Sequence, residues 1–275
     1  MDCELWIVNC MNGVWRLRKI TQLCLGTVQL GMPYVTKKPK LKDSLEILAF
    51  AESAGISCFD TAQAYGTAEE ILGTFGMGGD KRVITKLHPD ATRVDIQLSL
   101  DRLGVSKVFA FLLHRPSHMY SYGIAHRMRE LKLQGYCDHV GVSVYDKGDA
   151  IWAANADWVS AIEFPYNLLC KELDDSPFFD LAAGKVLIAR QPFAKGELFR
   201  CGMDFFGVNR AQACLQFVMN HIPRFDYVAF GVDDLRQLQE NIEGSKKSVP
   251  MMESNRIWRE SLKLNAYLPP SLWAN

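Results

Sequence analysis

Short apolar and β-branched runs recur along the chain, and each is followed by a stretch in which apolar residues have helical spacing. Eight runs predict strands, so the sequence reads as repeated β-then-α units. The predicted strands are Cys24–Thr27, Cys58–Thr61, Val83–Lys86, Val108–His114, His139–Val144, Ala161–Pro165, Val186–Gln191 and Tyr227–Gly231. The predicted helices are Lys42–Ala54, Ala68–Thr74, Arg93–Leu103, Gly123–Gln134, Lys147–Ala154, Asp174–Ala182, Asn209–Asn220 and Asp234–Glu243.

Helical crossovers make successive strands parallel, and eight such units close a (β/α)8 barrel, the TIM barrel of the α/β class, with no free sheet edge. A doubly wound open sheet is the alternative. Such a sheet usually carries G-x-G-x-x-G after its first strand, whereas Gly26 and Gly31 enclose Thr27 to Leu30 without that spacing. The pattern therefore favours the barrel.

The chain of 275 residues fits one such domain, which we expect over residues 19–275, including a C-terminal tail. The tail predicts a helix from Met251 onward that cannot extend through Pro269 and Pro270. Residues 1–18 show no clear period. They are interpreted either as an extension that plugs the bottom of the barrel or as the product of a start codon chosen too far upstream.

Charge and cysteine content limit the kinds of partner that the protein is expected to bind. Lys plus Arg and Asp plus Glu both number 31, and no long run of one sign is present that would attract nucleic acid or an anionic membrane. The eight cysteines include no pair at metal-knuckle or redox spacing, so we expect free thiols and no metal. The sequence thus predicts a cytoplasmic protein with a small-molecule partner, as either a monomer or a dimer.

Polar residues at predicted strand ends are the candidates for chemistry, because the carboxyl ends of barrel strands share one mouth. Asp60, Lys86 and His114 each close a strand, and Tyr65 follows Asp60 closely. Taken singly, each is more often a turn cap, a surface lysine or a structural histidine. Together they supply a proton donor, a cation to tune it, a carboxylate to hold the cation and an imidazole to orient a carbonyl.

The segment that contains these residues also carries a long motif. Residues 55–73, which include Phe59-Asp60-Thr61-Ala62 and Tyr65-Gly66, resemble the G-x-x-x-F-D-T-A-x-x-Y-G-x-x-E-x-x-L-G signature of the aldo-keto reductase family. The resemblance spans roughly residues 19–243. It continues at Gly26-Thr27, Thr85-Lys86, Leu113-His114, Gly141-Val142-Ser143, Pro165-Tyr166-Asn167 and residues 237–241.

This resemblance implies a (β/α)8 fold, a nicotinamide cofactor (NADPH or NADH) and a catalytic tetrad that maps onto Asp60, Tyr65, Lys86 and His114. Hydride from the cofactor would reach the carbonyl carbon while Tyr65 protonates the oxygen. Lys86, held by Asp60, would lower the pKa of Tyr65, and His114 would polarise the carbonyl.

The cofactor-binding positions implied by the resemblance agree less closely with the family pattern. Val144 stands where Asn is frequent, Glu163 where Gln is usual, and Arg190 where many members stack a Tyr on the nicotinamide. Bases that grip the 2′-phosphate of NADPH are not evident in residues 231–234, where Asp233 and Asp234 lie instead. The expected cofactor-binding residues are Gly26, Thr27, Asp60, Ser143, Glu163, Arg190, Gly231, Glu240 and Asn241.

The leading hypothesis is reduction of an aldehyde, a ketone or a sugar-like carbonyl. The alternative is a cofactor-binding regulatory or adaptor barrel with little turnover, and a weaker one is a lyase or isomerase that uses Lys86 as a Schiff-base nucleophile. The sequence leaves the substrate open. The residues expected to line its site are Tyr34, His88, Arg115, His118, Tyr120, Phe205 and Phe206.

Overall fold

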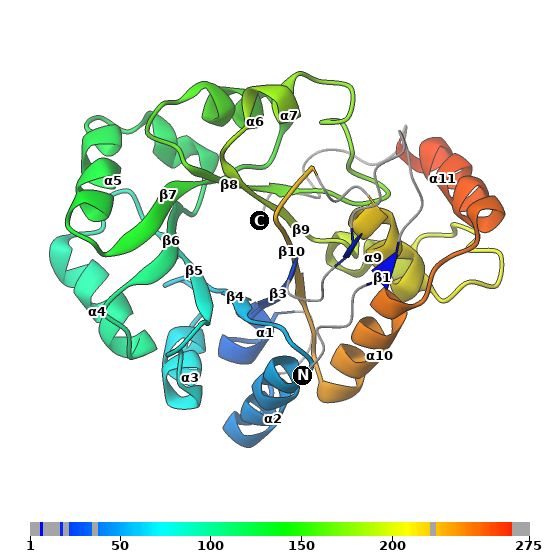
Figure 1. Cartoon of the computed structure of the whole chain (residues 1–275), viewed down its shortest axis with the longest axis horizontal. Helices are drawn as coiled ribbons and strands as arrows, with labels where there is room; N and C mark the ends of the chain where they lie inside the picture. Colours follow the sequence, from blue (N-terminus) through cyan, green and yellow to red (C-terminus); the bar gives the residue numbers. More distant parts are fainter. Residues whose placement is uncertain (1–5, 8–16, 19–21, 35–37, 221–223, 266–275) are drawn as a thin grey trace.

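A closed barrel of eight parallel strands forms the centre of the protein (Figure 1). The computed structural model describes residues 6–7, 17–18, 22–34, 38–220 and 224–265. The strand order around the barrel is β10-β3-β4-β5-β6-β7-β8-β9. The strands are β3 (Leu23–Gly26), β4 (Cys58–Asp60), β5 (Arg82–Leu87), β6 (Val108–Leu113), β7 (Cys137–Ser143), β8 (Ala161–Pro165), β9 (Val186–Arg190) and β10 (Tyr227–Gly231). The predicted (β/α)8 fold is confirmed, and each strand lies within two residues of its predicted bounds.

Helices surround the barrel and shield it from solvent (Figure 1). They are α1 (Val28–Gly31), α2 (Leu41–Ser53), α3 (Ala68–Phe75), α4 (Arg93–Leu103), α5 (Ile124–Leu133), α6 (Lys147–Asn155), α7 (Phe178–Leu181), α8 (Glu197–Arg200), α9 (Arg210–Asn220), α10 (Leu235–Lys246) and α11 (Met251–Asn265), with short 3-10 turns at Pro116–Tyr120 and Ala194–Gly196. The structure adds α1, α8 and the two 3-10 turns, which are too short to show a helical period in the sequence.

The predicted helix Asp174–Ala182 is wrong in its first half, because α7 covers only Phe178–Leu181. Pro177 disfavours helical geometry at the residue before it. Asp174 instead accepts hydrogen bonds from the Tyr166 hydroxyl at 2.9 Å and from Arg224 at 2.6 Å. These contacts hold the segment as a turn.

The core consists of two layers separated by the barrel wall. Small side chains such as Cys24, Cys58 and Ala110 alternate with larger ones such as Leu112 to fill the interior, where eight strands leave room for side chains only. Larger side chains, among them Phe111 and Phe164, pack between the strands and the helices. A third cluster lies beneath α11, where Leu198 and Ile257 are buried.

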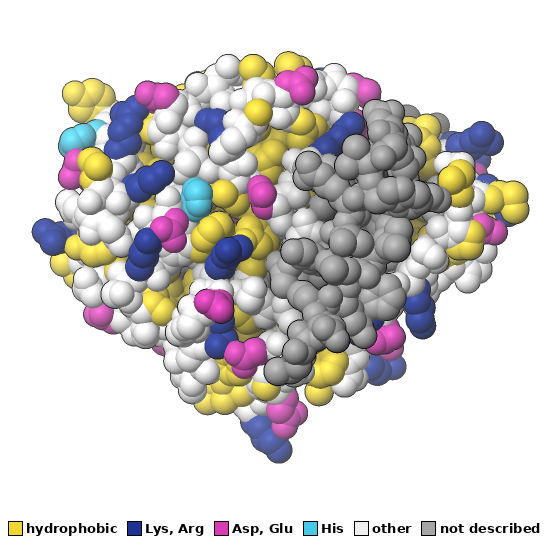
Figure 2. Space-filling view, viewed as in Figure 1, with side chains coloured by type: hydrophobic (Ala, Val, Ile, Leu, Met, Phe, Trp, Pro, Cys, Tyr) yellow, Lys and Arg dark blue, Asp and Glu magenta, His cyan; other side chains and the backbone are white. Residues whose placement is uncertain are grey.

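Of residues 1–18, the structure describes only Trp6–Ile7 (β1) and Leu17–Arg18 (β2), which pair antiparallel. The expectation that this segment plugs the barrel lies outside the described residues. Lys, Arg, Asp and Glu side chains are interspersed over the face in Figure 2, in keeping with the balanced charge. The six cysteines in the described part are free thiols, and no described helix could cross a membrane.

A close backbone contact positions the loop after β4. Gly31, at the end of α1, packs against the backbone of Tyr65, and its carbonyl oxygen accepts a hydrogen bond from the Thr67 amide at 3.2 Å. A Cβ atom at Gly31 would overlap the Tyr65 carbonyl oxygen. Glycine at this position therefore lets α1 approach the loop that carries Tyr65.

Replacing Gly31 by alanine should lower the free energy of unfolding by about 3 kcal/mol, because backbone on both sides must move to relieve the overlap. Urea denaturation would measure the change. Gly78→Ala is the matched control, since a Cβ atom there meets no heavy atom within 4 Å. Equal stabilities of the two variants would contradict the close contact.

Candidate active site

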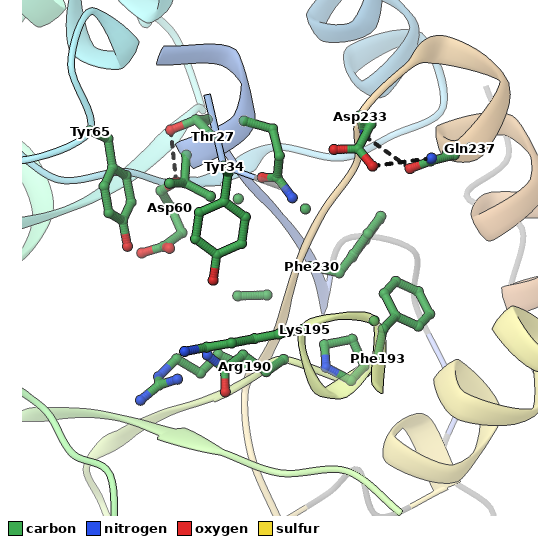
Figure 3. Close-up of a pocket in the computed structure, with 18 of the residues that line it drawn as sticks. Thr27, Tyr34, Asp60, Tyr65, Arg190, Phe193, Lys195, Phe230, Asp233 and Gln237 are labelled. Carbon is green, nitrogen blue, oxygen red and sulfur yellow. Dashed lines mark hydrogen bonds between the residues drawn. The ribbon is translucent and has the colours of Figure 1, made fainter. Parts of the chain in front are cut away.

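A cavity of about 670 Å³ opens at the carboxyl ends of the barrel strands (Figure 3). This volume falls in the range of about 300–1,000 Å³ for ligand pockets. Its lining includes all of the expected tetrad residues and all of the expected cofactor-binding residues, namely Gly26, Thr27, Asp60, Tyr65, Lys86, His114, Ser143, Glu163, Arg190, Gly231, Glu240 and Asn241. The mouth of the barrel therefore gathers residues from almost the whole chain.

Lys86 carries the central charge at the inner end of the cavity, which is the end lined by Asp60, Tyr65 and His114. Its side chain is 2% exposed, and its ammonium donates a hydrogen bond to Asp60 Oδ1. A second carboxylate, Glu163 on β8, lies 3.2 Å from Lys86 Nζ. The sequence predicts Asp60 alone as the partner of this lysine, so Glu163 is an added counter-ion.

The environment shifts both pKa values of the Asp60–Lys86 pair. Burial and the neighbouring Glu163 raise the pKa of Asp60 to about 7, although Lys86 acts to lower it. Burial by itself would lower the pKa of Lys86, but Asp60 and Glu163 together raise it above its ordinary value. Lys86 is therefore a permanent cation at neutral pH.

Tyr65 and His114 lie on the cavity side of Lys86. The Lys86 ammonium is 5.4 Å from the centre of the Tyr65 ring, and the Tyr65 and His114 ring centres are 5.6 Å apart in an edge-on arrangement. Burial raises the pKa of Tyr65 above its ordinary value, and Lys86 is the largest influence that lowers it. The net direction is upward, which differs from the expected lowering and keeps the phenol protonated.

The imidazole of His114 is neutral at physiological pH. Burial and the nearby Lys86 lower the pKa of His114 to about 4. A neutral imidazole with a pKa this low is a poor proton donor, but it can donate a hydrogen bond to an oxygen in the cavity. Tyr65 can thus supply a proton, whereas His114 can supply only a hydrogen bond.

Glu163 also approaches Arg190, which ends β9. Arg190 Nε lies 3.6 Å from Glu163 Oε1, and the guanidinium donates a hydrogen bond to the Val144 carbonyl at 3.0 Å. The same guanidinium lies 5.0 Å from the centre of the Tyr145 ring. Tyr145, which the sequence did not predict at the site, donates in turn to the His114 carbonyl at 3.3 Å.

Two glycines lie at the cavity where β10 meets β3. Gly231 and Gly26 are register partners, and Asp60 is the partner of Gly26 on the next strand. The Thr27 hydroxyl donates to the Asp60 carbonyl at 3.0 Å, so it ties these strand ends together (Figure 3). On the opposite wall, Ser143 and Glu163 are register partners of β7 and β8.

The far end of the cavity lies at the start of α10. Figure 3 places Asp233 and Gln237 on the opposite side of the cavity from Tyr65, with Gln237 Nε2 3.3 Å from Asp233 Oδ2. Asp234 is not part of the lining. Its carboxylate caps α10 by accepting from the Gln237 amide at 2.8 Å, so of the two aspartates only Asp233 lines the cavity.

The segment after β9 is strained and lines the cavity. Gln191, Ala194 and Lys195 have φ values of 59°, 51° and 54°, in the left-handed region that non-glycine residues rarely adopt. Lys195 and Arg200 also line the cavity, although the sequence did not predict them there. Lys195 follows a strand end closely, so the rule that found Lys86 could also have found it.

The expected substrate-site residues are mostly elsewhere. Tyr34 lines the cavity and directs its hydroxyl into it (Figure 3). His88, Arg115, His118 and Tyr120 are absent from the lining. Phe205 is buried in the cluster beneath α11, and Arg256 lies over the Phe206 ring at 3.8 Å, because the long loop after α8 packs away from the mouth.

The lining fits a nicotinamide dinucleotide. Gln191 Oε1 is buried without a hydrogen-bond partner, so a polar group of the lining remains to be matched, and Ser143 adds a neutral hydroxyl. Lys195 and Arg200 bring positive charge suited to a diphosphate. Within the described residues, no group of three or more His, Cys, Asp or Glu could hold a metal ion.

Comparison with known proteins agrees with this geometry. Residues 22–202 match the model of the Aldo/keto reductase family. Aldo-keto reductase str7 of Strobilurus tenacellus is 25% identical over 174 residues, or 57% of this chain. Aflatoxin B1 aldehyde reductase member 2 of Rattus norvegicus is 34% identical over 109 residues, or 34% of this chain. This chain spans about half or less of these curated relatives, with 52% and 28% of their lengths aligned.

Solved structures show the same fold. An aldo-keto reductase from Bacillus halodurans in its holo form has a TM-score of 0.72 at 17% identity, covering 94% of this chain and 96% of that one. An aldo/keto reductase from Klebsiella pneumoniae in complex with NADP and acetate has a TM-score of 0.71 at 19% identity, covering 86% and 90%. With the fold and the family match in agreement, this chain belongs to the aldo/keto reductase family.

Proposed function

We propose that this chain reduces the carbonyl group of a small aldehyde, ketone or sugar-like substrate with NADPH or NADH. The observation that carries the proposal is that Tyr65, Lys86, Asp60 and His114 converge in one cavity of about 670 Å³, whose lining extends to residues of α10. The NADP named with the Klebsiella structure and the aldehyde reductase named among the relatives support the same cofactor and reaction.

In this proposal Tyr65 is the proton donor. Its raised pKa keeps the phenol protonated at neutral pH, so a proton is available for the oxygen of the reduced carbonyl. The ammonium of Lys86 stabilises the phenolate that remains, and Asp60 and Glu163 hold that ammonium in position. His114, neutral at this pH, donates a hydrogen bond that orients and polarises the carbonyl.

The cofactor would span the cavity from the tetrad to α10. Bound there, it would supply the hydride for the carbonyl carbon. Ser143, Glu163 and Arg190 would hold the nicotinamide end, and Gly26, Thr27 and Gly231 would let the backbone lie close to it. Lys195 and Arg200 would bind the diphosphate, while Glu240 and Asn241 would contact the adenosine end.

The two alternatives make different demands on the site. A Schiff-base lysine must lose its proton, but the raised pKa of Lys86 opposes that loss. A regulatory or adaptor barrel would bind the cofactor with little turnover, and the departures at Glu163 and Arg190 from the usual residues are the feature that favours it. Turnover of carbonyl compounds by the purified protein separates this second alternative from a reductase.

Replacing Tyr65 by phenylalanine should lower kcat for carbonyl reduction by at least about a thousandfold, because the proton donor is lost while the ring is kept. Steady-state kinetics would measure kcat, and quenching of tryptophan fluorescence would show cofactor affinity close to that of the parent. Tyr122→Phe, at a fully exposed tyrosine, is the control and should match the parent. Turnover of Tyr65→Phe within tenfold of the parent would rule out this role.

Replacing Lys86 by methionine should slow both directions of the reaction and shift the alkaline limb of alcohol oxidation to higher pH. The direction follows from charge, since the ammonium lowers the pKa of Tyr65 and its removal lets that pKa rise further. The pH dependence of kcat would measure the shift. Lys107→Met removes an exposed lysine paired with Asp138 and should leave the profile unchanged.

Asp233 should weaken the binding of NADPH relative to NADH. A carboxylate about 4 Å from the 2′-phosphate costs on the order of 1 kcal/mol even in water, so Asp233→Asn should raise the relative affinity for NADPH about fivefold. Titration with each cofactor would measure it. Asp234→Asn is the control, because asparagine can still cap α10 and position 234 lies outside the cavity lining. Equal effects of the two variants would refute the assignment of Asp233.

A further inference from the structure

Glu163 and Arg190 form a second pair of opposite charges beside the Asp60–Lys86 pair. Glu163 is 1% exposed and Arg190 is 8% exposed, and both line the cavity. Their closest atoms, Glu163 Oε1 and Arg190 Nε, are 3.6 Å apart, and the other Glu163 oxygen faces Lys86 at 3.2 Å. The two pairs therefore form one buried cluster of two cations and two carboxylates.

The charge of this cluster is balanced only when all four members are present. Lys86 and Arg190 contribute two positive charges, and Asp60 and Glu163 contribute two negative charges when ionised. His114 adds none at neutral pH. Removing Glu163 alone would leave a net positive charge at the inner end of the cavity, and removing Arg190 alone would leave a net negative one. A buried charge of either sign acts strongly because little water screens it.

The proposed reaction changes charge at this same end. Tyr65 can protonate a carbonyl oxygen only where its hydroxyl reaches, so the hydride must arrive at the carbon bonded to that oxygen. A nicotinamide ring is neutral when reduced and carries one positive charge when oxidised. The cluster lies next to Tyr65, because Lys86 Nζ is 5.4 Å from the centre of the Tyr65 ring. Its net charge would therefore act on a nicotinamide ring that delivers hydride beside Tyr65.

We propose that Glu163 and Arg190 set the relative affinities of this protein for oxidised and reduced nicotinamide cofactor. Glu163 favours the oxidised form and Arg190 favours the reduced form. Because the two side chains oppose each other, the intact pair keeps the affinity ratio near that of an uncharged site. This inference rests on the proposed function, since it assumes that the cavity binds a nicotinamide cofactor.

Equilibrium titrations of four proteins would test the proposal, using the oxidised and reduced forms of whichever cofactor the parent binds. The measured quantity is the ratio of the Kd for the oxidised form to the Kd for the reduced form, obtained at pH 8.5 without substrate. Glu163→Gln should raise this ratio at least about tenfold, and Arg190→Gln should lower it by a similar factor. The double variant should return to within about threefold of the parent.

Arg236→Gln is the matched control. Arg236 lines the far end of the same cavity and is 79% exposed, and the cofactor carries the same charge there in both redox states. This variant should change both affinities together and leave the ratio unchanged. The ratio thus separates a charge effect at the inner end from general weakening of binding.

Thermal unfolding of each protein would be recorded alongside the titrations, because loss of one partner from a buried pair destabilises the fold. If Arg190→Gln does not fold, Glu163→Gln and the double variant still decide the question, because the first should raise the ratio and the second should leave it close to that of the parent. A parent that binds neither redox form overturns the proposed function and this inference with it. A parent that binds cofactor, with an unchanged ratio in the single variants that fold, overturns this inference alone.

Discussion

The buried ammonium of Lys86 is the charge on which the arrangement of the inner cavity depends. An isolated charge at 2% exposure would be strongly unfavourable, so the fold must supply counter-ions. Asp60 comes from the neighbouring strand, and Glu163 from β8, which is three places along in the strand order, so this contact crosses the barrel interior. The closed barrel therefore determines the charge state of the lysine and, through it, the properties of Tyr65.

The scaffold fixes this cluster with short backbone contacts. The strand register pairs Gly26 with Asp60, so the ends of β3 and β4 lie at the same level. It also pairs Ser143 with Glu163, so these residues of β7 and β8 lie side by side. The close approach of Gly31 to the Tyr65 backbone positions the loop that carries the phenol. By contrast, the wall after β9 is strained at Gln191 and Lys195, as is common where a backbone is shaped for a ligand. Rigid strand ends and one strained segment together shape the cavity.

The two ends of the cavity differ in their electrostatics. At the inner end, cations and carboxylates are paired and buried, so a change of one charge is felt strongly. At the α10 end, Arg236 and Glu240 are largely exposed, and water screens their interaction. A charge that changes at the inner end therefore has a stronger effect on its neighbours than one that changes at the α10 end.

The sequence by itself determined the eight strands, because alternation of apolar runs and helical spacing is a local property of the chain. It also indicated Asp60, Tyr65, Lys86 and His114 as candidate site residues that would lie together, since strand ends and a long motif mark them. It could not reveal that Glu163 contacts Lys86, because that contact joins non-adjacent strands. Likewise, only the structure separated Asp233, which lines the cavity, from Asp234, which caps α10. Side-chain direction and cross-barrel distance depend on how the barrel closes, and no local pattern of residues encodes them.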